Sequence, residues 1–322
     1  MDNQIILSIC IPTYNRASYL DKLLNSITKQ IDGINSVEVL ISDNASTDDT
    51  QTVVEKYKKL NSKIIYLRNE KNIGAEKNFI QVLNSGKGCF LKLVNDYLEF
   101  KENSIDLMLS YIKSNISEKP ILFFTNGNSI SKTKFECINK IGLEQFLDEA
   151  SFYTTWIGAI GLWKDDYQNI LSKHQFITKN FFQTELLFEC FESKNNSIIY
   201  GKKIFDANLV NNQHIDYNYF DAFLEDYLNN LLFRLKTTNR ITSKCFSKQK
   251  KMLFTGFVYP RYKTFKIKKN HSFNINTKGM EKTIFQIYKT CPYFYWYLIY
   301  FPVYLFGFFI KKLFKFQKAV HF

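Results

Sequence analysis

Glycine and proline are scarce in this sequence, with 12 glycines and 5 prolines among 322 residues, while it holds 31 phenylalanines and 20 tyrosines. This composition argues against a disordered or fibrous protein. The six cysteines form no CxxC pair and lack the spacing of a zinc finger, so we expect thiols in a reducing cytosol. No cationic stretch precedes the first apolar segment, and we therefore expect no secretory signal.

Acidic residues are also in deficit, with 30 Asp and Glu against 43 Lys and Arg and a formal net charge of +13. A basic balance favours anionic partners, such as a phosphate-bearing substrate, an anionic membrane or nucleic acid. No nucleic-acid-binding motif is present, so we expect no nucleic-acid partner. The hydrophobic fraction of 45% is enough for a sizeable core, in one large domain or two smaller ones.

Short apolar segments alternate with helical patterns through about residue 125. Turn residues and helical spacing separate these segments, a pattern typical of βαβ units in an α/β protein with a mainly parallel sheet and helices on both faces. Beyond this region the pattern is mixed, and it predicts a strand at 154–163, a helix at 181–193, a strand at 198–204 and a helix at 217–235. The strands expected in the first part are 7–11, 37–41, 64–67, 89–94 and 121–124.

Polar side chains follow each of the first four predicted strands. Ligands of open parallel sheets bind beyond the carboxyl ends of the strands, so these side chains are candidates for one site. Their mixture of acceptors and cations suits a nucleotide diphosphate. Turn chemistry and helix capping remain the alternative for Asp43, Asn44 and Ser46. In chain order the candidates are Thr13, Asn15 and Arg16; Asp43 and Asn44; Arg68, Asn72 and Asn78; and Asn95 and Asp96.

Three stretches of sequence carry a family resemblance: Ile11-Pro-Thr-Tyr-Asn-Arg16, Ile41-Ser-Asp-Asn-Ala-Ser-Thr-Asp48 and Asn72-Ile-Gly74. Together they resemble the family 2 glycosyltransferases, which have the Rossmann-like GT-A fold of nucleotide-diphospho-sugar transferases. Among these, the chain is most similar to bacterial capsule and O-antigen transferases of the abequosyltransferase-like kind. The resemblance is strong over 5–100, moderate up to 206 and absent beyond. It implies that the candidates from Thr13 to Asn95 bind the donor.

The metal motif departs from the family pattern. The family usually has D-x-D at the end of the fourth strand, whereas this chain has Asn95-Asp96-Tyr97. The resemblance implies Mg²⁺ or Mn²⁺ held by Asp96 and Asn95, because phosphate oxygens and water supply the remaining ligands of a hard cation. Two alternatives stay open: Lys92 or another cation neutralises the diphosphate without metal, or Asn95-Asp96 is only a strand-ending turn.

The resemblance also implies a catalytic base at the start of a helix downstream of the metal motif. Glu185 occupies that position, with Gln183 and Thr184 as neighbours facing the acceptor. An inverting transfer needs a carboxylate that accepts the proton of the attacking hydroxyl. The alternative is a first-turn carboxylate favoured by the helix dipole. Asp165 and Asp166 are reserve candidates for the base.

Aromatic residues offer a further acceptor contact. Trp156 and Trp163 have faces suited to stacking on a sugar, although core packing explains them as well.

The C-terminal part has a different composition. Residues 292–310 are almost wholly apolar and aromatic, with lysines on both sides. Their length is close to that of a membrane span, but prolines and interfacial aromatics favour a segment that lies in the inner leaflet. Packing on the protein itself is a third possibility. We divide the chain into a GT-A domain at 1–206 (a nucleotide-sugar half at 1–100 and an acceptor half at 101–206), a basic helical extension at 207–290 and a membrane-associated segment at 291–322.

These observations predict an inverting glycosyltransferase of surface polysaccharide biosynthesis. Its expected donor is a nucleotide-diphosphate sugar, and its acceptor is a glycan or polyprenyl-linked oligosaccharide. A weak anchor raises the effective concentration of a lipid-linked acceptor, so we expect the cytoplasmic face of the cell membrane, with the cytoplasm as the alternative location. The alternative function is a non-catalytic nucleotide-sugar or glycan-binding module with a degenerate metal site.

Overall fold

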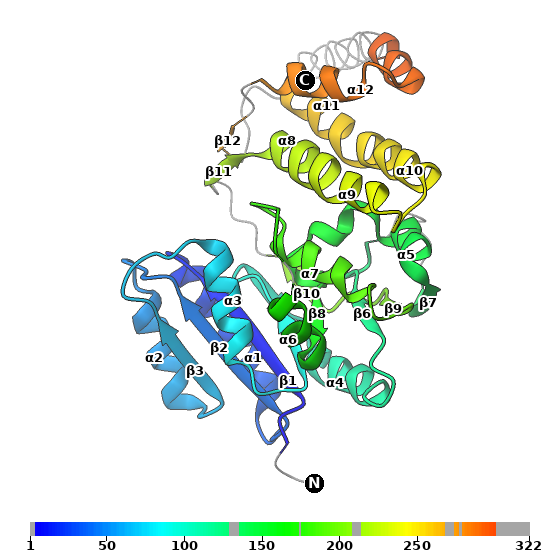
Figure 1. Ribbon diagram of the computed structural model, residues 1–322. Coiled ribbons are helices and arrows are strands. Elements are labelled where there is room, and N and C mark those ends of the chain that lie inside the picture. Colours follow the sequence, from blue (N-terminus) through cyan, green and yellow to red (C-terminus); the bar gives the residue numbers. More distant parts are fainter. Residues whose placement is uncertain are drawn as a thin grey trace, which may run out of the picture.

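The computed structural model describes residues 4–128, 135–173, 175–207, 214–267, 274–276 and 279–300. Its central sheet has the strand order β3-β2-β1-β4-β8, in which β8 alone runs antiparallel to its neighbour. The expected mainly parallel α/β sheet is therefore confirmed (Figure 1). The strands are β1 (Leu7–Thr13), β2 (Val37–Asp43), β3 (Ile64–Arg68), β4 (Phe90–Leu93) and β8 (Gly161–Trp163).

Helices cover both faces of this sheet. Ile9 and Ile11 of β1 belong to one buried cluster, which includes apolar side chains of α1, α2 and α4. Cys10 belongs to a second cluster, which includes Val82 and Leu83 of α3. Successive strand residues point to opposite faces, so strands covered on both sides are apolar throughout. The helices are α1 (Ala17–Ile31), α2 (Thr50–Leu60), α3 (Ala75–Ser85) and α4 (Ser104–Ser114).

A second, smaller sheet lies beside the first. The predicted strand at 121–124 is present, but it pairs with β9 in parallel rather than joining the central sheet, and β7 completes this three-stranded sheet. Residues 123 and 160 connect it to the central sheet through an isolated bridge. A further antiparallel pair is formed by β5 and β10. These strands are β5 (Leu98–Phe100), β6 (Ile121–Phe124), β7 (Cys137–Ile141), β9 (Asn196–Tyr200) and β10 (Phe205–Ala207).

The prediction of one strand over 154–163 is wrong for most of its length. Two short 3₁₀ helices, η1 (Ser151–Thr155) and η2 (Ile157–Ala159), precede β8. The hydroxyls of Thr154 and Thr155 donate to the carbonyls of Ser151 and Phe152, at 2.7 and 2.8 Å. Threonine hydroxyls that bond the local backbone compete with strand pairing, which explains the difference. Around this region lie α5 (Gly142–Ala150), α6 (Lys164–Lys173) and α7 (Phe182–Cys190).

Helices dominate the chain from residue 219 onward. The helix expected at 217–235 is present, but its middle turns are π-helical. A second long helix also contains a π-helical stretch, and the short strands β11 and β12 pair with each other. Residues 292–300 are helical as well. The elements are β11 (His214–Asn218), α8 (Tyr219–Asp221), η3 (Ala222–Leu232), α9 (Phe233–Thr237), α10 (Ser243–Leu253), η4 (Phe254–Val258), α11 (Tyr259–Ile267), β12 (Asn274–Asn276) and α12 (Met280–Tyr288).

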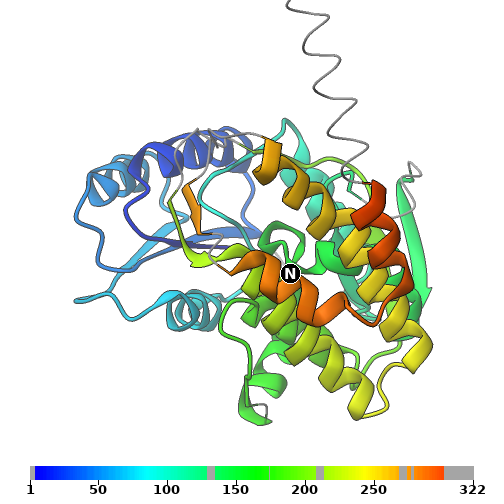
Figure 2. The same ribbon diagram turned by 90° about the horizontal axis from the view of Figure 1, so that it is seen from above.

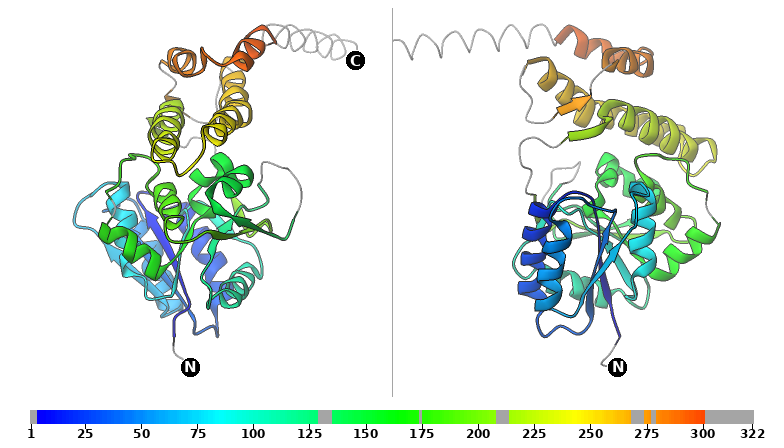
Figure 3. Two further views of the ribbon diagram at one scale, coloured as in Figure 1. Left: turned by 45° about the vertical axis from the view of Figure 1, so that its right-hand side comes forward. Right: turned by 90° about the vertical axis from the view of Figure 1, so that its left-hand side faces the viewer.

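We call residues 219–300 the helical extension. It stands over the end of the α/β part that lies opposite the N-terminus, so β1 runs toward it (Figure 3). Seen from above, α12 and residues 292–300 form its outermost layer (Figure 2). The boundary that we drew at 206 stays a prediction.

Among the described residues, no helix combines the length and the apolar character needed to cross a bilayer. The remainder of the predicted membrane segment, 301–322, lies outside the described residues.

Candidate functional site

The carboxyl ends of β1, β2 and β4 bring the first polar residues together. Thr13 pairs in register with Asp43, and Asp43 pairs with Arg68 on β3. From the other side, the Thr13 hydroxyl donates to Asp96 Oδ2 at 3.0 Å. The predicted meeting of these strand ends at one edge of the sheet is therefore present in the structure.

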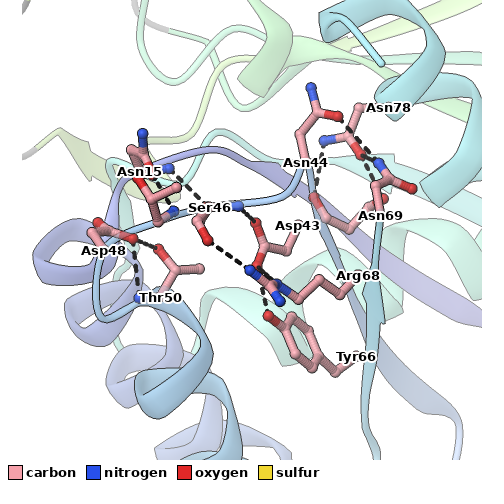
Figure 4. A network of polar contacts seen from close by, with 12 residues as sticks. Asn15, Asp43, Asn44, Ser46, Asp48, Thr50, Tyr66, Arg68, Asn69 and Asn78 are labelled. Carbon is pink, nitrogen blue, oxygen red and sulfur yellow. Dashed lines mark hydrogen bonds and ion pairs between the residues drawn. The ribbon is translucent and has the colours of Figure 1, made fainter. Parts of the chain in front are cut away.

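Asp43 is the buried centre of one network (Figure 4). Its Oδ1 accepts from the Ser46 amide at 2.8 Å, and its Oδ2 accepts from the Tyr66 hydroxyl at 2.6 Å. Arg68 Nε lies 3.4 Å from the same Oδ2. Burial and the adjacent carboxylate raise the pKa of Tyr66 well above its usual value. The sequence analysis did not single out Tyr66. This residue lies on the same face of β3 as Arg68, because side chains two residues apart in a strand point the same way.

The neighbouring asparagines hold two loops together. Asn44 Nδ2 donates to Asn72 Oδ1 at 2.8 Å, and Asn44 Oδ1 accepts from the Ile73 amide and from Asn69. Asn78, buried on α3, bonds both the hydroxyl and the carbonyl of Ser42. These amides position the loop after β2 against the loop after β3, and Asn69 is a member that the sequence analysis did not single out.

Asn15 shapes the loop after β1. It has a left-handed backbone with φ of 52°, which asparagine tolerates better than most residues. Its amide donates to the Ser46 hydroxyl at 2.9 Å, and its Oδ1 accepts from the Thr47 amide at 2.8 Å. Asp48 accepts from the Ala17 and Thr50 amides and so connects the starts of α1 and α2.

Asp96 and Asn95 form the part of the edge with unused acceptor capacity. Burial raises the pKa of Asp96 to about 6, against the opposing effects of the nearby Arg16 guanidinium and the Thr13 hydroxyl. Asn95 Oδ1 is buried and has no hydrogen-bond partner among the described residues. A buried carbonyl oxygen without a partner costs free energy, which is commonly offset when a ligand, water or ion binds. No group of three or more His, Cys, Asp or Glu side chains forms a metal cluster in the described part of the chain.

Lys92 is buried with its donors in use, so the alternative in which it neutralises a diphosphate is wrong. Its ammonium is fully buried and donates to the carbonyls of Leu93, Gly158 and Ile160 at 2.9, 2.7 and 2.9 Å. Burial lowers the pKa of Lys92 to about 7. All three donors of the ammonium are used, and they fasten the η2 segment to the end of β4.

The predicted acceptor residues gather around the same segment. Gln183 Nε2 donates to the Thr155 carbonyl and the Thr184 hydroxyl donates to the Thr154 carbonyl, both at 3.0 Å. Trp156 follows directly and is half-buried, with its ring edge-on to Phe205 at 6.1 Å. The first turn of α7 is thereby held against the segment that Lys92 fastens to β4.

Glu185 is buried at 2% exposure within a hydrogen-bonded network. Its carboxylate accepts from the Ile177 and Thr178 amides at 3.1 Å and from the Thr178 hydroxyl at 3.0 Å. Arg234 of the helical extension lies 3.3 Å away. These contacts fix the carboxylate in place, and its role as a base stays a prediction.

The reserve bases lie at the wrong end of the sheet. Because β8 runs antiparallel to β4, with Phe90 opposite Trp163, the chain after β8 emerges at the amino end of β4. Asp165 and Asp166 there pair with Lys119 and Lys194 at 2.5 and 2.6 Å. Trp163 is buried, and its indole donates to the Pro120 carbonyl, so it packs in the core rather than against an acceptor.

Comparison with known proteins agrees with this geometry. Residues 8–137 match the family described as "Glycosyl transferase family 2". The abequosyltransferase RfbV of Salmonella typhimurium is 36% identical over 111 residues, which are 34% of this chain and 33% of that protein. The poly(ribitol-phosphate) beta-N-acetylglucosaminyltransferase TarS of Staphylococcus aureus is 30% identical over 133 residues, or 40% of this chain and 23% of that protein. The matched stretch thus spans a third or less of either relative.

A solved structure extends the similarity of fold. The crystal structure of S. aureus TarS 1-349 in complex with UDP-GlcNAc superposes with a TM-score of 0.63 and 19% identity, covering 82% of this chain and 77% of that one. The described residues therefore have the expected GT-A fold. Residues 8–137, which carry the strand ends described above, are therefore the part of this chain that is similar to the family 2 glycosyltransferases.

Proposed function

We propose that this chain is an inverting glycosyltransferase that transfers a sugar from a nucleotide-diphosphate donor to a glycan or polyprenyl-linked acceptor in capsule or O-antigen synthesis. One observation carries the proposal: at the edge where β1, β2 and β4 end, Asp96 accepts from Thr13, and the neighbouring Asn95 has a buried oxygen with no hydrogen-bond partner among the described residues. Arg68, paired with Asp43, adds a cation to the same edge. Carboxylates, amide oxygens and a guanidinium are the groups that recognise a ribose, a base and a diphosphate.

The residues at this edge fit a divalent cation such as Mg²⁺ or Mn²⁺. Asp96 supplies one carboxylate, and Asn95 Oδ1 supplies a buried oxygen to which no described residue donates. Hard cations bind a few such oxygens and take their other ligands from phosphate and water. A cation bound there would neutralise charge on the departing diphosphate. Thr13 keeps the Asp96 carboxylate in place through its hydroxyl.

The acceptor side of the proposal rests on the η1–η2 segment and α7. We infer that Glu185 accepts the proton of the attacking hydroxyl, with Gln183, Thr184 and Trp156 around the acceptor. Support comes from Lys92, whose bonds to Gly158 and Ile160 attach this segment to the strand that ends near Asp96. For the transfer, an acceptor hydroxyl must replace one of the groups that donate hydrogen bonds to the Glu185 carboxylate in this structure.

We also infer that the C-terminal segment associates with the cytoplasmic face of the membrane. Trp296 and Ile299 are exposed at 63% and 73%, although tryptophan and isoleucine favour an apolar or interfacial environment. Lys282 and Lys289 are exposed nearby in the sequence and would favour anionic headgroups.

A thermal-shift screen of UDP-, GDP-, dTDP- and CDP-sugars, with and without Mn²⁺, tests the donor site. A bound donor raises the melting temperature by mass action. We expect Mn²⁺ to increase the shift in the natural chain, and Asp96→Asn to remove the Mn²⁺-dependent part. Asp165→Asn, at the opposite end of the sheet, is the matched control and should leave the shift unchanged.

Assays of hydrolysis and transfer, run with the donors that bind in this screen, separate the rival functions. If a donor binds but is neither hydrolysed nor transferred, the chain is a non-catalytic binding module. If no nucleotide sugar changes the melting temperature, the proposed function is wrong.

A further inference from the structure

The helical extension contains an apolar cavity of about 190 Å³. It lies between η4 and α11 on one side and α12 with residues 292–300 on the other. Its wall is mainly aromatic and aliphatic; lining residues include Phe254, Tyr259, Tyr262, Ile284, Phe294 and Tyr297. A dry apolar cavity of roughly 150 Å³ already binds benzene, so this one has room for part of a hydrocarbon chain.

The mouth of the cavity is at the protein surface. Phe285 and Leu298 both line it, and they are exposed at 50% and 44%. Ile299 and Tyr300, next in the chain, are exposed as well. An apolar cavity that opens onto an exposed apolar surface gives a hydrocarbon chain a continuous path from a bilayer to the interior.

Cations accompany the tyrosines of the cavity wall. Lys263 Nζ lies 4.8 Å from the centroid of the Tyr259 ring, and Lys266 Nζ lies 5.7 Å from that of Tyr262. Lys266 also pairs with Glu281, the acid that lines the cavity. Ammonium groups beside an apolar cavity match a ligand with an anionic head and an apolar tail.

We propose that this cavity binds the single hydrocarbon chain of a lipid phosphate, with the phosphate near Lys263 and Lys266. A single cavity of this size suits one chain rather than the two of a diacyl phospholipid. A single-chain lipid phosphate is the chemical class of a polyprenyl-linked acceptor, and in this identification the inference rests on the proposed function. The site then holds the lipid part of the acceptor. The helical extension that contains it stands over the edge where β1, β2 and β4 end.

Calorimetric titration of the full chain with farnesyl phosphate, below its micelle concentration, tests the proposal. We expect saturable binding, weaker binding of farnesol and no binding of inorganic phosphate at the same concentrations. Leu298→Trp places a larger side chain at the mouth and should weaken binding at least tenfold. Gln286→Trp, next to Phe285 on α12 but exposed and outside the lining, should leave the affinity within about twofold.

A second pair of variants tests whether a lysine beside the cavity contacts the phosphate of the lipid. Lys263→Gln should weaken farnesyl phosphate binding several-fold without changing the affinity for farnesol. Lys248→Gln, on α10 and in an ion pair with Asp148 of α5, should change neither. Melting temperatures of all variants establish that they are folded.

Two results would overturn the proposal. The first is equal binding by the two tryptophan variants. The second is an absence of binding in the full chain, which is the outcome if the chain's own residues 301–322 occupy the cavity. Donor thermal shifts are measured on the same samples. Lipid-phosphate binding without any nucleotide-sugar binding would contradict only the proposed function, and the converse would contradict only this inference.

Discussion

At the scale of single residues, Lys92 shows how one buried cation joins two parts of the protein. Its buried ammonium holds the carbonyls of Gly158 and Ile160 to β4. A buried cation is unfavourable unless hydrogen bonds compensate for lost hydration. Those three carbonyl contacts explain why a lysine is accommodated in the core.

The lowered pKa of Lys92 gives a pH-dependent prediction. Between its folded pKa of about 7 and its usual value, the unfolded chain holds a proton that the folded chain has lost. Stability therefore rises with pH in this window, by up to about 1.4 kcal/mol per pH unit. Relative to Lys92→Met, the natural chain should gain unfolding free energy between pH 7 and 9. Urea denaturation at several pH values measures the difference, and parallel curves for the two proteins would refute the prediction.

Glu185 allows a second prediction at this scale. If it is the base, Glu185→Gln should lower the transfer rate by about 10²- to 10⁴-fold while donor binding stays unchanged. If it only holds the Ile177–Thr178 backbone, the melting temperature should fall and the folded fraction should keep its rate. Steady-state transfer and thermal melts distinguish the two. Glu192→Gln, an exposed acid just past α7 that pairs with Arg240, is the control and should leave the rate unchanged.

At the scale of elements, the loops after β2 and β3 act as one unit. Asn44 alone contacts Asn72, Asn69 and the Ile73 amide. These contacts fix the loop after β2 to the loop after β3. The edge where β1, β2 and β4 end therefore depends on amide side chains as well as on carboxylates.

Asn44→Ala should therefore destabilise the fold and weaken donor binding together. Loss of the amide removes the hydrogen bond from the part-buried Ile73 N–H and those to Asn69 and Asn72, each worth about 0.5–1.5 kcal/mol. Chemical denaturation measures the stability, and the donor thermal shift measures the binding. Asn25→Ala, on the exposed face of α1, should change stability by no more than about 0.5 kcal/mol. An Asn44→Ala protein as stable as this control would show that the network is not needed.

At the scale of the whole molecule, the helical extension is attached to η1 and α7 of the α/β part. Thr154 contacts the Tyr227 hydroxyl at 3.4 Å, and the rings of Phe152 and Phe257 lie 5.8 Å apart. Arg240 pairs with Glu189 of α7 at 2.8 Å. A change in the extension is therefore able to alter the segment that carries Trp156.

The exposed apolar residues of the extension give a prediction at this scale. Replacing both Trp296 and Ile299 by serine should reduce binding to vesicles that contain anionic lipid, because their apolar area is lost from the interface. Both are largely exposed, so the melting temperature should change little. Vesicle sedimentation measures the effect, with Leu60→Ser, another exposed apolar residue at 69%, as the control. Equal sedimentation of all three proteins would contradict the membrane proposal.

The sequence by itself determined the parallel strands, their helices and the edge at which their polar carboxyl ends meet, because local periodicity and turn residues encode short elements and the carboxyl ends of parallel strands must meet. Tertiary structure alone decided what depends on pairing between distant segments. It made half of the residues in 154–163 3₁₀-helical, paired 121–124 in a second sheet and placed Asp165 at the opposite edge through one antiparallel strand. It also buried Lys92 among three carbonyls and surrounded Glu185 with backbone amides. No pattern along the chain specifies such contacts, because each joins residues that only the folded packing brings together.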